Sequence, residues 1–100
     1  MRKIEKEMLQ AIAYGETFRK DNTEVDVNSE GSSEKFNIYL HGNHIATAYR
    51  VGRMLEVDTN RETLASWPTV TTKSRLRALG VDLTQSKGRI FIDGEFVCEA

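Results

Sequence analysis

The stretch that decides the fold is residues 67–80, which read WPTVTTKSRLRALG. Pro68 disfavours a helical backbone at the residue before it, and Val70 and the three threonines favour a β-strand. A threonine hydroxyl can cap the N-terminus of a helix, and Gly80 can end that helix. The pattern predicts a strand end that leads directly into a short helix capped by Thr71 or Thr72.

This predicted helix is basic, since it contains Lys73, Arg75 and Arg77. With a cap at Thr71 or Thr72, the first two cations fall in the first turn. There the helix dipole favours anions, and an exposed cation costs about 0.3–1 kcal/mol. We therefore expect these cations to make contacts outside the fold instead of stabilising it.

Length and composition bound the possible functions. The chain has 100 residues, of which 39% are hydrophobic, and a formal net charge of -1 at pH 7. This length supports one hydrophobic core, so we expect a single domain over residues 1–100. The net charge gives no overall attraction to nucleic acid or membranes. Without an apolar run long enough for a signal peptide or membrane span, we expect a cytoplasmic protein.

Hydrophobic periodicity predicts the elements on either side of residues 67–80. Apolar residues at helical spacing predict an amphipathic helix from Met1 to about Tyr14 that ends at Gly15. Alternating apolar and polar residues predict strands at 23–28, 36–40, 45–51, 53–57, 89–92 and 95–98. The Asp93-Gly94 pair predicts a tight hairpin between the last two strands, and His41-Gly42-Asn43 supplies an earlier turn.

Polar segments connect these elements. Residues 19–22 and 82–86 receive no element, and residues 29–33, with Gly31 and three serines, predict a loop. Residues 61–66 fit either a helical turn or a loop. The predicted fold is α+β: a mostly antiparallel sheet of about five or six strands with an N-terminal amphipathic helix and a second short basic helix.

No sequence pattern indicates a catalytic or metal site. His41 and His44 flank a turn without a third good ligand nearby, so we interpret them as solvated turn histidines. Cys98 is the only cysteine, which excludes an internal disulfide, and the adjacent Glu99 raises a thiol pKa. The glycines are scattered singly, so no phosphate-binding loop is present. We expect a protein that is not an enzyme and uses no cofactor.

Charge is segregated along the chain. Residues 21–34 contain five acidic residues and no basic one: Asp21, Glu24, Asp26, Glu30 and Glu34. Residues 73–89 contain five basic residues, against Asp82 alone: Lys73, Arg75, Arg77, Lys87 and Arg89. The simplest interpretation is that the two segments attract each other, within the fold or between two copies of the chain.

Two functional interpretations also stand. The free amides at a helix start bind anions, and the neighbouring side chains can complete a phosphate or carboxylate pocket with Trp67 as a stacking surface; these side chains are Thr71, Thr72, Lys73 and Arg75. Alternatively, the acidic segment can imitate a phosphate backbone and occupy a basic groove of another protein. Trp67 itself is more often a core residue than a ligand platform.

Two segments resemble small proteins encoded by lytic bacteriophages: Leu40-His41-Gly42-Asn43-His44-Ile45-Ala46 and residues 67–76. Those proteins typically show a Leu-His-Gly-Asn-x-Ile-Ala turn and a Gly-Trp-x-Thr-x-Thr-Thr-Lys-Ser-Arg-Leu-Asn-Ala-Leu block, and the similarity spans about residues 1–80 of this chain. Here Ser66 replaces the usual glycine, and Arg77 the usual asparagine. The resemblance implies a phage origin. Small phage proteins outside the particle often bind and disable host machinery, including CRISPR systems.

We therefore predict a non-enzymatic phage protein that binds a host protein or ribonucleoprotein complex and inhibits a host defence system, as anti-CRISPR proteins do. It is expected to be a monomer or homodimer, with no membrane partner and no metal. The predicted binding residues are Trp67, Thr71, Thr72, Lys73, Arg75, Arg77, Asp21, Glu24 and Asp26. The alternative is a nucleic-acid-binding accessory protein that uses the basic helix, whose affinity would fall steeply with salt.

Overall fold

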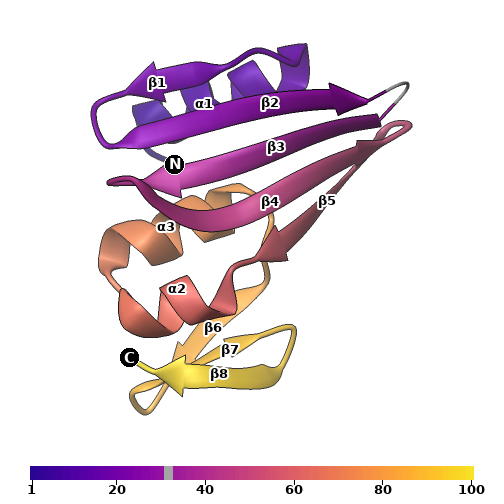
Figure 1. Cartoon of the computed structure of the whole chain (residues 1–100). Helices are drawn as coiled ribbons and strands as arrows, with labels where there is room; N and C mark the ends of the chain where they lie inside the picture. The colour runs from indigo at the N-terminus through magenta and orange to yellow at the C-terminus, as the bar shows by residue number, and fades with distance from the viewer. Residues whose placement is uncertain (31–32) are drawn as a thin grey trace.

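The computed structural model describes residues 1–30 and 33–100 of an α+β protein (Figure 1). Its elements in chain order are α1 (Lys3–Tyr14), β1 (Phe18–Lys20), β2 (Thr23–Glu30), β3 (Ser33–Leu40), β4 (Asn43–Val51), β5 (Met54–Thr59), α2 (Arg61–Ser66), α3 (Val70–Ala78), β6 (Leu83–Ser86), β7 (Arg89–Ile92) and β8 (Glu95–Glu99). The predicted fold class is confirmed. The strands, however, form two antiparallel sheets, a five-stranded one in the order β1-β2-β3-β4-β5 and a three-stranded one in the order β6-β7-β8.

The helices lie against the five-stranded sheet. In Figure 1, α1 runs behind β1 and β2, while α2 and α3 lie between this sheet and the three-stranded sheet. The register pairs Val25 with Ile38 and Ile38 with Ala46, so these side chains point to the same face. All three are buried. Small residues on β4, such as Ala46, allow a helix to approach the sheet closely.

One hydrophobic cluster contains residues from both sheets and all three helices. The helices contribute its Met8, Ile12, Leu64 and Leu76, and the strands contribute, among others, Val25, Phe36, Ile38, Ile45, Ile90 and Ile92. Because the three-stranded sheet buries Ile90 and Ile92 against the same cluster, it is packed as part of the core rather than as an appendage.

Short turns join the strands at the places that the sequence predicts. His41 and Gly42 have φ angles of 53° and 78°, and Asp93 and Gly94 have 52° and 80°. Two successive residues with positive φ are the signature of a type I′ turn, whose twist matches the twist of the flanking strands. Both predicted hairpins are therefore confirmed.

The start of α3 differs from the prediction. The helix begins at Val70, which was expected in a strand, and its cap is Thr69, whose Oγ1 accepts a hydrogen bond from the Thr72 amide at 3.1 Å. The weak strand preference of Val and Thr yields here to a cap that satisfies a free amide. The predicted end is confirmed: Gly80 has φ 97°, and its N–H donates to the Arg77 carbonyl at 3.0 Å.

Segments without a firm prediction are mostly regular. Residues 61–66 form α2, and the polar segments at 19–22 and 82–86 contain most of β1 and β6. Part of the predicted loop at 29–33 is instead strand, because β2 extends to Glu30 and β3 begins at Ser33. Gly31 and Ser32, and the side chain of Glu30, lie outside the described residues.

The Asp93-Gly94 turn gives a first testable prediction. A Cβ built on Gly94 meets no atom within 4 Å, so the cost of a side chain there comes from the backbone conformation alone. We expect Gly94→Val to lower the free energy of unfolding by about 1 kcal/mol or more, and Gly94→Asn to lower it less. Urea denaturation of both variants checks this, and equal midpoints would contradict it.

Candidate binding site around Trp67

The structure places Arg75 inside the fold, not on its surface. Its side chain is 3% exposed, and its Nη1 lies 2.7 Å from Oε2 of Glu5, which is 2% exposed. The two residues come from α3 and α1. The expectation that Arg75 makes contacts outside the fold is wrong, because the partner that neutralises it lies 70 positions away and cannot be recognised from local sequence.

Hydrogen bonds surround this buried ion pair. The Glu5 carboxylate also accepts from Ser74 Oγ at 2.6 Å and from the Arg2 amide at 3.2 Å. The Arg75 guanidinium donates in addition to Thr23 Oγ1 at 3.1 Å and to Asn22 Oδ1 at 3.4 Å. The ion pair therefore connects α1, α3 and the start of β2, and its charged groups have several hydrogen-bonding partners each.

The electrostatics of Glu5 follow from these contacts. Burial alone would raise the pKa of the Glu5 carboxyl, but the hydrogen bonds from Ser74, Arg75 and Arg2, together with the charge of Arg75, hold that pKa below its usual value. The carboxylate is therefore the form that the fold requires.

The other predicted cations of α3 are partly engaged within the chain. Lys73 Nζ donates to Gln85 Oε1 at 2.5 Å, and Arg77 Nε donates to the Leu83 carbonyl at 3.0 Å. Thr72 is buried, and its Oγ1 lies 2.9 Å from Thr69 Oγ1, while Thr71 is half-buried near Arg2. These side chains tie α3 to β6 and to the α3 cap, so they do not form an open anion pocket.

The residues of the acidic segment come from the β1–β2 turn, from β2 and from the start of β3. Asp21 is in the β1–β2 turn, and Asp26 is exposed on β2; Glu24 pairs with Arg19 at 3.5 Å. Glu34 pairs with Arg50 at 3.2 Å. Among the side chains that the structure describes, no ion pair joins this segment to the basic residues 73–89. Arg75 contacts the segment through the neutral side chains of Asn22 and Thr23 instead.

Trp67 lies on the surface, although a tryptophan is more often a core residue. Its side chain is 56% exposed at the C-terminal end of α2, in the connection to α3. It borders a cavity of about 220 Å³ that is lined by Leu40, His41, Asn43, Ile45, Thr63, Trp67, Thr69 and Thr72. This lining contains no Lys, Arg, Asp or Glu, so the cavity fits an apolar side chain better than a phosphate group. We call these eight residues the Trp67 groove.

Two helix caps hold Trp67 in place. Asn60 Oδ1 accepts from the Thr63 amide at 3.2 Å at the start of α2, and the Trp67 amide donates to the Thr63 carbonyl at 2.8 Å at its end. Pro68 then restricts the backbone before Thr69 caps α3. The tryptophan therefore sits on a short connection between two capped helices.

His44 belongs to this support. It is half-buried, its Nδ1 lies 3.2 Å from Asn60 Nδ2, and its Nε2 lies 2.9 Å from Thr47 Oγ1. Because Thr47 donates to Asn37 Oδ1 at 3.1 Å, it can accept from His44 Nε2, while Asn60 Nδ2 can donate to His44 Nδ1. The interpretation of His44 as a solvated turn residue is therefore wrong, whereas His41 is exposed.

Cys98 is not among the residues of the Trp67 groove. Cys98 is buried, and burial followed by the charge of Glu99 raises the pKa of its thiol, as the sequence predicts. Among the described residues, no group of three or more His, Cys, Asp or Glu side chains is placed to hold a metal ion. No described helix has the length and apolarity needed to cross a membrane.

Comparison with known proteins identifies the family. The model of a bacteriophage protein family, described as Kyanoviridae Gp96 protein, matches residues 1–99. The chain belongs to this family. The phage origin implied by the resemblance is thereby confirmed. No curated protein and no solved structure matches the chain.

Sequence reasoning missed two features of this site. The first is α2, which Asn60 as cap and Glu62 in the first turn could have indicated. The second is the exposure of Trp67. Pro68 directly after it gives a signal for a position in a connection, but burial there depends on how α2 and α3 pack.

The lowered pKa of Glu5 predicts a pH dependence of stability. Since the carboxyl titrates at lower pH in the folded than in the unfolded chain, its contribution is complete above about pH 4.3 and is lost as the pH falls. We expect Glu5→Gln to lose less stability than the parent between pH 6 and 3, although it is less stable at pH 6. Urea denaturation across this range measures it. Glu62→Gln, which removes an exposed carboxylate, is the control.

Arg75 and Lys73 should differ sharply on substitution. Arg75→Met leaves Glu5 buried without a cation, which costs about 3–5 kcal/mol, whereas Lys73→Met should cost less than about 0.5 kcal/mol. The double variant Glu5→Gln, Arg75→Met should lose less than the sum of the single losses. Thermal denaturation checks the series, and similar melting temperatures for the two Met variants would refute the buried ion pair.

Proposed function

We propose that this phage protein binds a host protein through the Trp67 groove and thereby inhibits host machinery, such as a CRISPR system or another defence. The observation that carries the proposal is the exposure of Trp67, 56%, beside a cavity with uncharged lining. Tryptophan is among the residues that most often dominate the energy of protein interfaces. The protein would act without catalysis and without a cofactor, in the cytoplasm of the host.

The way in which Trp67 is held supports this proposal. Its main chain is bonded to Thr63, and both flanking helices are capped by side chains. A main chain that is already positioned before binding loses less conformational entropy when a partner covers the residue.

The alternative function, nucleic-acid binding by the basic helix, has less support. Of the three cations expected to contact phosphate groups, Arg75 is buried against Glu5. Lys73 and Arg77 each donate to an acceptor within the chain. A nucleic-acid surface needs several free cations side by side, and α3 offers at most the exposed parts of two.

The acidic residues remain a second candidate surface for a host protein. Asp21 and Asp26 are exposed and Glu24 is half-buried, all near the β1–β2 edge of the sheet. If they imitate a phosphate backbone, binding should depend on their charge and weaken with salt. The Trp67 groove predicts a weak salt dependence, because its contacts are apolar.

Affinity capture from host lysate tests the proposal, with the parent chain and Trp67→Ala as baits, each with and without nuclease treatment. Phe96→Ala is the matched control, since Phe96 is an aromatic residue of similar exposure, 53%, on β8. We expect a host protein that the parent and Phe96→Ala retain, and that Trp67→Ala binds about 30-fold more weakly or worse in a titration, as for a residue worth about 2 kcal/mol.

Three results would contradict this expectation. If folded Trp67→Ala binds as tightly as the parent, the Trp67 groove is not the interface. If nuclease treatment removes the captured protein, nucleic acid is the direct partner. If instead the triple variant Asp21→Asn, Glu24→Gln, Asp26→Asn loses binding while Trp67→Ala keeps it, the acidic residues form the interface.

A further inference from the structure

The last strand of the five-stranded sheet has a free edge. β5 pairs with β4 on one side, and the sheet ends there. The phase of the ladder is fixed by the Asn60 amide, which donates to the Ile45 carbonyl at 2.8 Å. Along an antiparallel strand, the main-chain N–H and C=O groups of successive residues point alternately toward the neighbouring strand and away from it. The even-numbered residues of β5 therefore bond β4, as Asn60 does. Leu55, Val57 and Thr59 therefore direct their N–H and C=O groups outward.

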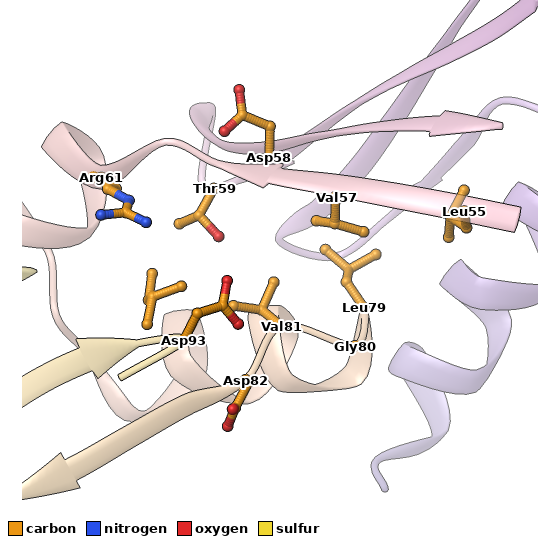
Figure 2. Close-up of a pocket in the computed structure, with 11 residues that line it drawn as sticks. Leu55, Val57, Asp58, Thr59, Arg61, Leu79, Gly80, Val81, Asp82 and Asp93 are labelled. Atoms are coloured by element: carbon orange, nitrogen blue, oxygen red, sulfur yellow. The ribbon is translucent and has the colours of Figure 1, made fainter. Parts of the chain in front are cut away.

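These three residues border a cavity. It has a volume of about 260 Å³ and is lined by Leu55, Val57, Asp58, Thr59, Arg61, Leu79, Gly80, Val81, Asp82, Ile92 and Asp93. Figure 2 shows β5 on one side and the segment after α3 on the other, with the side chains of Leu55, Val57 and Thr59 turned toward it. No backbone hydrogen bond between β5 and this segment is present among the described residues. The cleft thus lies beside the free edge, over the face of β5 that carries the odd-numbered side chains.

Both faces beside this edge are acidic. Glu56 and Asp58 alternate on the face of β5 turned away from the cleft, and both are exposed and outside the ion pairs of the described chain. On the cleft side, the Asp93 carboxylate points into the gap (Figure 2). The nearest cation of the lining, Arg61, lies 3.5 Å from Glu95 and is thereby paired.

We infer that the edge of β5 is a second docking surface, which binds an extended basic segment of another protein as an added strand. The outward groups of Leu55, Val57 and Thr59 would supply the main-chain hydrogen bonds. Lysine or arginine side chains at alternate positions would lie opposite Glu56 and Asp58, the arrangement that stabilises neighbouring strands. A second copy of β5 fits less well, because its own Glu56 and Asp58 would meet the same acidic groups.

A synthetic peptide tests this inference. The probe is an eight-residue peptide, acetylated and amidated, in which lysine alternates with threonine; the control peptide has glutamate in place of lysine. We expect the lysine peptide to shift the amide resonances of Leu55, Val57 and Thr59 in ¹H–¹⁵N spectra of the full chain, and the glutamate peptide to leave them in place. No shift with the lysine peptide, or equal shifts with both, overturns the inference.

Two variants separate strand addition from general charge attraction. Leu55→Pro removes an outward N–H without removing a bond to β4, so it should abolish peptide binding in a folded chain. Glu56→Gln with Asp58→Asn should weaken the lysine peptide about fivefold, as expected for two cross-strand charge pairs. Removing two exposed carboxylates elsewhere, in Glu16→Gln with Glu62→Gln, should change nothing. Unchanged binding in both test variants, or equal weakening by the control, overturns the inference.

Two further results show which part of the inference is wrong if the peptide test fails. If the β5 amides shift with protein concentration when no peptide is present, a second copy occupies the edge and the proposed occupant is wrong. Trp67→Ala should bind the lysine peptide as the parent does, since the Trp67 groove shares no residue with the cleft. Loss of peptide binding in that variant would mean that the two surfaces are not independent, and would overturn the inference.

Discussion

The ion pair between Glu5 and Arg75 is the contact on which the rest of the structure depends. It is the one pair with both side chains fully buried among the ion pairs of the described residues. A buried ion pair adds little net stability over a well-packed apolar pair, but a single unpaired charge in the same place is very costly. Any arrangement of α1 against α3 that separates the two charges is therefore strongly disfavoured. The pair fixes the position of both helices on the sheet.

The position of Trp67 depends in turn on the placement of α3 by this ion pair. α3 is anchored at Arg75, and its first turn is capped by Thr69, two residues after the tryptophan. α2 is anchored through Asn60, which His44 contacts from β4. Every buried polar side-chain atom in the described part of the chain has a hydrogen-bonding partner. Satisfied polar contacts therefore hold both ends of the connection that carries Trp67, while Trp67 itself is exposed.

Local features of the fold were predictable because their causes are local. A glycine at the second position of a two-residue turn, as at Gly42 and Gly94, and a helix end at Gly15 need only neighbouring residues to be understood. The burial of Arg75 could not be predicted from neighbouring residues, because its partner Glu5 lies 70 positions away in the sequence. From its neighbours alone, Arg75 was expected to be an exposed cation. The exposure of Trp67 likewise depends on packing between α2 and α3. The structure thus corrects the expected exposure of Arg75, while the assignment of Trp67 to a binding site stays a prediction.

The strand order of the five-stranded sheet affects how the chain folds during its synthesis. β1 to β5 pair strictly with their neighbours in sequence, so the whole sheet can assemble from a contiguous segment with short loops. The carboxylate of α1, however, receives its cation only from residue 75. A ribosome that has released the sheet but not yet α3 therefore holds an intermediate whose first helix cannot bury its inner face without an unpaired charge. Docking of α1 with its carboxylate paired requires α3, so the first helix depends on a segment that is made after the whole five-stranded sheet.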